Sequence, residues 1–255
     1  MKAKTVRRAG RGASAALAVL LLGVAGVACS SADAADDGKG GASASASGSA
    51  GTDGPAAHRS ADAELLAGLP SAMADDGVRI VVGRADAPHT VAVAVDPQCG
   101  WCAKFEANGG KALAQAVKDG RVKAEYTVAS FLDRGETGGS TRAANAMRAS
   151  VESGRFAEFH AAVFASQAPE HGSGFTVEHL LRIADQVDCL RGAAFDRAVK
   201  ELGHHEWVAK SMKAFTASGD TAVPSVRIDG EKVTDTDALL SADGFAKELR
   251  AHGVR

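Results

Sequence analysis

The sequence contains only four cysteines, too few and too unevenly spaced for a small protein held together by disulfides: Cys29, Cys99, Cys102 and Cys189. It also lacks an excess of positive or negative charge, because it contains 29 Lys and Arg residues and 31 Asp and Glu residues. This balance excludes a nucleic-acid binder with a basic surface. Only one segment, near the start, is apolar enough to enter a membrane, which excludes a channel or transporter. Of the 255 residues, 45% are hydrophobic, so the chain is not wholly disordered and can form one good-sized domain.

The first 29 residues have the pattern of an export signal. A cluster of Lys and Arg residues within 2–11 is followed by an uncharged, apolar run over 12–29. This run is short for a permanent spanning helix, which needs about 20 apolar residues. It ends in Ala-Gly-Val-Ala-Cys, which resembles a bacterial lipobox. The resemblance implies a lipoprotein signal peptide over 1–29 and a lipid on Cys29; an ordinary signal or an uncleaved anchor are the alternatives.

A flexible linker is predicted over 30–64. This stretch contains no Val, Leu, Ile, Met or aromatic residue and is rich in Ala, Ser and Gly, so it cannot bury apolar surface. Loss of the basic signal residues would leave the mature chain acidic. Anionic polymers such as nucleic acids are therefore not expected partners.

Apolar periodicity begins at Leu65 and predicts a folded domain over 65–255. Short strands are expected over 78–82, 90–95 and 122–128, because each is rich in Val and bounded by turn or polar residues. Between the second and third strands, 102–117 has the composition of a helix, with a kink at its Gly-Gly pair.

An all-helical block is expected next, over about 138–218, with Thr176 as a helix N-cap. Two strands over 225–228 and 231–233 then form a hairpin around an Asp-Gly turn, and a final helix is capped near Ser241. This order predicts an α/β fold in which one domain is interrupted by helices.

The chemistry of the chain is expected at the pair Cys99 and Cys102. A zinc site needs about four ligands, but there is no second Cys-x-x-Cys or His-x-x-x-His motif, so we expect no metal. A purely structural disulfide is a second alternative. Redox chemistry is favoured, because a cysteine at a helix N-terminus faces unpaired N–H groups and the positive end of the helix dipole.

These groups stabilise a thiolate, so the pKa of Cys99 should fall below its free value of about 8.5. Cys99 comes first and is expected at the exposed tip, where it would be the nucleophile that forms mixed disulfides. Cys102 lies one turn later and is expected to be the shielded thiol that resolves them. Cys189 is expected to be a buried cysteine; a regulatory or resolving role is the alternative.

Three motifs together resemble the thioredoxin superfamily, specifically its DsbA-like branch: Gly83 to Pro88, the run Asp96-Pro-Gln-Cys-Gly-Trp-Cys102, and Thr221 to Ser225. The resemblance implies a thioredoxin-like fold with a helical insertion. It also implies that Pro224 is cis and lies beside the cysteine pair, and that the Val223 backbone pairs with an extended substrate. A trans proline that opens a strand is the alternative.

Two departures from that branch concern the redox properties. The acid that many members bury six residues before the first cysteine is replaced by Val93, which leaves open how Cys102 loses its proton; water is one acceptor. The dipeptide Gly100-Trp101 carries no charge, so a milder oxidant is expected. Both residues are candidates for substrate contact, although Trp101 could instead pack on the helix.

The sequence thus predicts an extracytoplasmic, lipid-anchored thiol–disulfide oxidoreductase that needs no cofactor. We expect it to form disulfides in exported proteins, with a membrane redox partner that restores the cysteine pair. A reductase or isomerase is the alternative within the same class. A non-catalytic, peptide-binding lipoprotein with the same fold is the alternative from another class.

Overall fold

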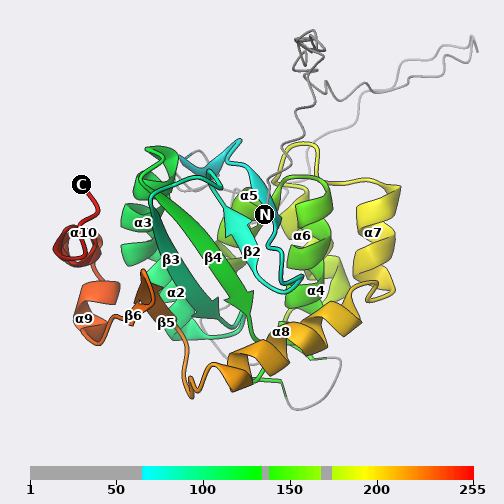
Figure 1. Cartoon of the computed structure of the whole chain (residues 1–255). Coiled ribbons are helices and arrows are strands. Elements are labelled where there is room, and N and C mark those ends of the chain that lie inside the picture. The colour runs from blue at the N-terminus through cyan, green and yellow to red at the C-terminus, as the bar shows by residue number, and fades with distance from the viewer. Residues whose placement is uncertain (1–64, 134–137, 168–173) are drawn as a thin grey trace, which may run out of the picture. The chain divides into compact units, whose positions relative to one another are not determined.

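The computed structural model describes residues 65–133, 138–167 and 174–255. Its centre is a six-stranded sheet with the order β1-β2-β4-β3-β5-β6 (Figure 1). The strands are Ser71–Met73 (β1), Ile80–Val82 (β2), His89–Val95 (β3), Val122–Val128 (β4), Ser225–Ile228 (β5) and Glu231–Lys232 (β6). β3 and β4 run parallel, and every other neighbouring pair is antiparallel.

Val-rich sequences form the two central strands because β-branched side chains suit a pleated, buried surface. Val91, Val93 and Val95 of β3 are buried, and β4 spans the predicted range 122–128. In the β5–β6 hairpin, Asp229 and Gly230 both have a positive φ, at 49° and 88°. The predicted Asp-Gly turn is therefore confirmed, because a two-residue turn of this kind needs both central residues in the left-handed region.

The predicted helix over 102–117 is two helices. The first helix is Gly100–Ala107 (α2) and the second is Gly109–Lys118 (α3). Asn108 lies between them as the C-cap of α2 and the N-cap of α3. A Cβ on Gly109 would lie 2.3 Å from the Leu239 carbonyl oxygen. Close packing between the start of α3 and this backbone therefore requires glycine at the break.

The remaining helices form two groups. Between β4 and β5 lie Gly139–Glu152 (α4), Phe156–Ala165 (α5), Val177–Ala184 (α6), Ala193–Lys200 (α7) and His205–Ala217 (α8), and after the sheet come Thr236–Leu239 (α9) and Ala242–Ala251 (α10). The side chains of Thr176 and Ser241 accept hydrogen bonds from backbone N–H groups of α6 and α10, which confirms both predicted caps. Figure 1 shows α4, α6 and α7 on one side of the sheet and α9 and α10 on the other.

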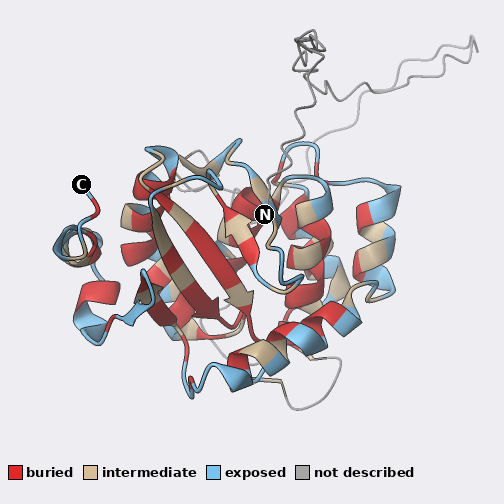
Figure 2. Cartoon of the chain, viewed as in Figure 1, coloured by how far each residue is buried: buried red, intermediate tan, exposed pale blue. Residues whose placement is uncertain are grey.

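One hydrophobic core joins the sheet to the helices around it. Figure 2 shows that β3 and β4 are buried along most of their length, whereas exposed residues gather on the outward faces of α6, α7 and α8. This α/β architecture is the predicted thioredoxin-like fold. β1 and α9 were not predicted. Among the described residues, no helix has the length and apolar character that a membrane span requires.

Candidate redox site

The cysteine pair lies where β3 gives way to α2. Cys99 is the N-cap of α2 and has extended backbone angles, φ −79° and ψ 116°, while Cys102 lies in the first turn of the helix. The Cys99 N–H donates to the Asp96 carbonyl oxygen at 2.9 Å, which closes the loop between the strand and the helix. The predicted position at a helix N-terminus is therefore what the structure shows.

The two sulfurs differ in access, but the expectation of an exposed tip was wrong. Cys99 is 8% exposed and Cys102 is 0% exposed. The Cys99 sulfur lies 3.5 Å from the Val223 carbonyl oxygen, to which it donates a hydrogen bond when it is protonated. Of the two cysteines, only Cys99 has any exposed surface for a partner to reach.

The environment moves the two thiol pKa values in opposite directions. A hydrogen bond from the Cys102 thiol is the largest influence on the pKa of Cys99 and lowers it, while burial opposes this effect. The backbone N–H groups of Cys102 and Trp101 lower it further, and the resulting pKa is about 6. Burial, and after it the neighbouring Cys99 sulfur, raises the pKa of Cys102 far above its ordinary value. At neutral pH the pair thus combines a thiolate at Cys99 with a thiol at Cys102.

The segment that precedes β5 meets this pair from the other side. The peptide bond between Val223 and Pro224 is cis, as the resemblance implied, and Val223 is 8% exposed. Trp101 is 57% exposed, and the Lys104 amino group lies 4.2 Å from the centre of its ring. Trp101 is therefore open to solvent on one side while it contacts Lys104 of its own helix, so substrate contact and packing on the helix both remain compatible with its position. A Cβ added to Gly100 would meet no atom within 4 Å.

A buried acid is present, but at a position that the sequence analysis did not select. Val93 is buried and apolar, whereas Asp96 is 0% exposed. The Asp96 carboxylate accepts hydrogen bonds from the N–H of Gln98 at 2.9 Å, the N–H of Leu132 at 3.1 Å and the hydroxyl of Ser140. Burial, with a smaller contribution from the Asp133 carboxylate, raises its pKa. A charged residue directly after an apolar strand is the signal that could have identified it.

Residues of the helical insertion hold the loop before Cys99. The Gln98 amide donates to the Asp133 carboxylate at 2.8 Å and to the Ser140 hydroxyl at 2.9 Å. The Gln167 amide, just after α5, donates to the carbonyl oxygens of Pro97 and Cys99. These contacts fix the backbone that carries the first sulfur, and spacing along the sequence did not predict them.

Of the other two cysteines, only Cys189 lies among the described residues, and it does not join the site. Cys29 lies outside the described residues, as do the whole predicted signal over 1–29 and the whole predicted linker over 30–64. Cys189 is exposed and has a φ of 59°, so the expectation of a buried cysteine was wrong. Within the described ranges, no group of three or more His, Cys, Asp and Glu side chains is arranged to hold a metal ion.

A Cys-x-x-Cys pair at a helix N-terminus, beside a cis-proline loop and on this sheet, defines a thioredoxin-fold protein. The thioredoxin family model matches residues 75–247, and the chain belongs to that family. No curated protein matches the sequence.

The fold is that of DsbA-like proteins. MdbA, a thiol-disulfide oxidoreductase from Corynebacterium diphtheriae, is 21% identical with a TM-score of 0.59, over 72% of this chain and 93% of that one. BdbD from Bacillus subtilis is 18% identical with a TM-score of 0.59, over 72% and 97% of the two chains. DsbA from Chlamydia trachomatis is 17% identical with a TM-score of 0.56, over 67% and 91%.

Proposed function

We propose that this protein is an extracytoplasmic thiol–disulfide oxidoreductase that forms disulfides in exported proteins through Cys99 and Cys102. The observation that carries the proposal is the opposite movement of the two thiol pKa values at the start of α2. Such a pair has one sulfur that is ionised, in a residue with a small exposed surface, and one that is protonated and fully buried. A merely structural disulfide has no need of this difference.

The reaction starts from the oxidised pair. A client thiolate attacks the Cys99 sulfur, because Cys102 has no exposed surface. A mixed disulfide with Cys99 forms, and Cys102 leaves and takes up a proton. A second client thiolate then attacks the client sulfur of the mixed disulfide, so that the client disulfide forms and Cys99 leaves as a thiolate. The low pKa of Cys99 makes it a good leaving group in this last step.

The segment before β5 provides the surface for the client backbone. The Val223 carbonyl oxygen lies 3.5 Å from the Cys99 sulfur, so an extended client that pairs with Val223 brings its own sulfur to the reacting atom. Pro224 has no N–H of its own, which leaves Val223 as the pairing residue. Gly100 and the exposed Trp101 complete the contact surface around Cys99.

The direction of electron flow follows from thiolate stabilisation. A stabilised thiolate favours the reduced pair, so the oxidised pair accepts electrons from clients. Each tenfold stabilisation is worth about 1.4 kcal/mol, or about 30 mV for a two-electron couple. A membrane redox partner then reoxidises the pair.

The predicted lipid on Cys29 and the linker over 30–64 place this chemistry outside the cytoplasm, near the membrane. Substitution of Cys29 by Ala tests the anchor. The protein should then move from the membrane fraction to the soluble fraction, and an unchanged membrane fraction would contradict a lipid at this residue.

The Cys102→Ala variant tests the catalytic proposal in cells. It cannot resolve mixed disulfides, so it should accumulate covalent, reducible adducts with exported proteins, whereas a Cys99→Ala variant should form none. Absence of adducts in the first variant would favour the peptide-binding lipoprotein. The reduction potential of the pair tests the direction: a value near that of thioredoxin, about −270 mV, would favour the reductase or isomerase.

A further inference from the structure

A cavity away from the redox pair, which we call the basic cavity, lies between α3 and α10, two helices that pack against each other (Figure 1). Its volume is about 190 Å³. The apolar part of its lining comes from both helices and from the chain after α10: Ala112, Ala246, Leu249 and Val254. Leu249 and Val254 are at most 3% exposed, so the apolar lining is continuous with the core.

The polar part of the lining carries positive charge. Among the described residues it consists of Gln115 and three arginines, Arg121, Arg250 and Arg255, and it includes no acidic side chain. Arg121 donates to the Asp119 carboxylate at 2.7 Å, and Gln115 donates to the same carboxylate. The side chains of Arg250 and Arg255 are exposed and have neither a hydrogen bond nor an ion pair within the described part of the chain.

Stability of the fold does not explain this cluster of charges. Arg250 lies in the last turn of α10, where a cation stabilises the negative end of the helix dipole. Arg121 and Arg255 lie outside the helices, so the dipole accounts for one of the three arginines at most. Like charges on one cavity repel one another, because nothing between them neutralises the two unpaired groups. An anion with an apolar part would satisfy both parts of the lining.

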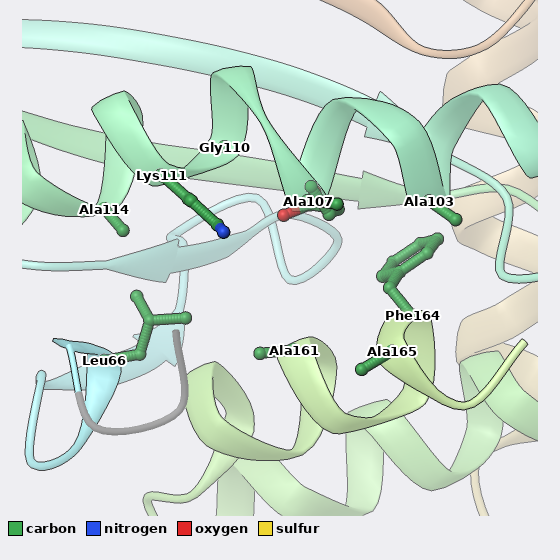
Figure 3. A pocket seen from close by; sticks show the side chains of 10 residues that line it. Leu66, Ala103, Ala107, Gly110, Lys111, Ala114, Ala161, Phe164 and Ala165 are labelled. Atoms are coloured by element: carbon green, nitrogen blue, oxygen red, sulfur yellow. The ribbon is translucent and has the colours of Figure 1, made fainter. Parts of the chain in front are cut away.

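A second cavity beside α3 differs in charge. Figure 3 shows it between α2 and α3 on one side and α5 on the other, with the Lys111 amino group pointing into it. Its volume is only about 60 Å³, and its wall includes Glu106, whose Oε1 lies 3.1 Å from Nε2 of His160. This cavity therefore combines a base with an acid. The excess of basic side chains is a property of the flank of α3 that faces α10.

The basic cavity and Cys99 lie at opposite ends of the sheet. Arg121 directly precedes β4, and β3 and β4 run parallel and in register over seven residues. Cys99 comes after the far end of β3. At about 3.3 Å per residue, the two strands separate these ends by roughly 20 Å. A flat surface that contacts the basic cavity would therefore leave Cys99 on the side away from it.

We propose that the basic cavity docks this domain on an anionic phospholipid surface and turns Cys99 towards the aqueous side. A lipid phosphate accepts hydrogen bonds from guanidinium groups, and the carbons next to the phosphate meet the apolar lining. The inference concerns the folded domain alone, so it holds with or without a lipid on Cys29. Each Arg beside an anionic membrane favours the bound state about fivefold, so the two unpaired arginines should favour it about 25-fold.

Amide hydrogen exchange of the full-length protein tests this docking region by region. The protein is mixed with vesicles of phosphatidylcholine, either alone or with phosphatidylglycerol. We expect the amides of 242–255 to exchange at least about threefold more slowly on the anionic vesicles, because these residues lie against the lipid. The amides of α2 should exchange equally on both. High salt should remove the difference, because it screens charges at the surface.

Two double variants isolate the charges that matter. Arg250→Gln with Arg255→Gln removes the two unpaired arginines and should abolish the slower exchange. Both side chains are exposed, so this variant should fold like the wild type. Arg182→Gln with Arg197→Gln is the matched control, because it removes two exposed arginines from α6 and α7 and changes the net charge equally. The control should keep the slower exchange, as should Arg250→Lys with Arg255→Lys.

Several results would overturn the proposal. Equal exchange on the two kinds of vesicle would do so, as would slower exchange that persists in Arg250→Gln with Arg255→Gln or disappears in the control. Slower exchange in α2 would contradict the orientation. Equal protection of 242–255 by inorganic phosphate without vesicles would indicate a site for a small anion instead of a lipid surface. None of these results depends on the reactivity of Cys99, so they leave the proposed redox function unaffected.

Discussion

The largest contribution to the low pKa of Cys99 comes from Cys102, and this can be tested directly. Replacement of Cys102 by Ala removes its S–H donor but leaves the backbone N–H groups of α2 in place. A hydrogen bond to a charged group is worth about 1.5–3 kcal/mol, which corresponds to about 1–2 pH units. The pKa of Cys99 should therefore rise from about 6 to between about 7 and 8. Cys102→Ser keeps a donor and should stay closer to 6.

The rate of alkylation of Cys99 by iodoacetamide, measured as a function of pH, reports this pKa because only the thiolate reacts. At pH 7 about nine-tenths of the wild-type Cys99 should be thiolate, against a few per cent for an ordinary cysteine. The reasoning is refuted if wild-type Cys99 titrates near 8.5, or if the Ala and Ser variants have the same pKa as the wild type.

The same pKa predicts how the stability of the reduced protein depends on pH. Because folding lowers the pKa of Cys99, the stabilisation is complete only above the unfolded value and is lost as the pH falls through about 6. At pH 7 it amounts to about 1.4 kcal/mol, equivalent to about 30 mV. Between pH 5 and pH 7, the free energy of unfolding of the reduced form, measured in urea, should rise by about 1.4 kcal/mol more than that of the oxidised form. An equal response of both forms to pH would contradict the assignment.

Three other substitutions have defined outcomes. Asp220→Asn breaks the ion pairs that the buried carboxylate makes with Arg227 and Lys232, and should lower the free energy of unfolding by about 2 kcal/mol at neutral pH. The loss should be smaller in acid, because these partners lower the pKa of Asp220 and their contribution disappears once the carboxylate is protonated. Gly109→Ala should cost about 2 kcal/mol, because the new methyl group overlaps a backbone oxygen. Trp101→Ala should leave stability unchanged within about 0.5 kcal/mol but slow the reaction with apolar peptide disulfides about fivefold.

Each of these three substitutions has a control that tests the physical cause given for its effect. Asp243→Asn removes an exposed carboxylate and should change stability by less than about 0.5 kcal/mol. Gly192→Ala adds a methyl group with no atom within 4 Å and should be nearly neutral. For Trp101→Ala, the reaction with glutathione disulfide is the reference and should keep its rate. If Asp243→Asn or Gly192→Ala lowered the free energy of unfolding as much as the substitution it controls, the stated cause would be wrong. The same holds for Trp101→Ala if its reaction with glutathione disulfide slowed as much as its reaction with apolar peptide disulfides.

Local signals predicted most of the elements of the fold. The strand over 122–128 and the two caps Thr176 and Ser241 were found because β-branched content and cap chemistry act within a few residues. β1 was missed because the segment Ser71–Met73 has little strand propensity of its own and pairs only with β2. α9 is a single turn, too short for a periodic pattern, although its cap Asp235 was visible in the sequence.

For the site, the sequence predicted the groups that lie within one motif and not those that packing brings together. The sequence predicted the low pKa of Cys99 and the shielding of Cys102, but it attributed the pKa to the helix N-terminus, whereas the Cys102 thiol makes the larger contribution and the backbone N–H groups a smaller one. The contact between the Cys99 sulfur and the Val223 carbonyl oxygen joins two residues that are far apart in sequence. The contact between Glu106 and His160 depends on the packing of α5 against α2, and no spacing rule could have predicted it.

The register of the sheet explains why distant segments converge on Cys99. Ala94 of β3 pairs with Ser225 of β5, so the chain just before β5 must lie beside the loop that leaves β3. β4 runs parallel to β3 and ends opposite Val95, so the chain that enters the helical insertion starts from the same edge of the sheet. The insertion can therefore supply groups such as Gln167 to the loop before Cys99. We infer that changes within the insertion alter the redox site through this loop, without any contact with the sulfurs.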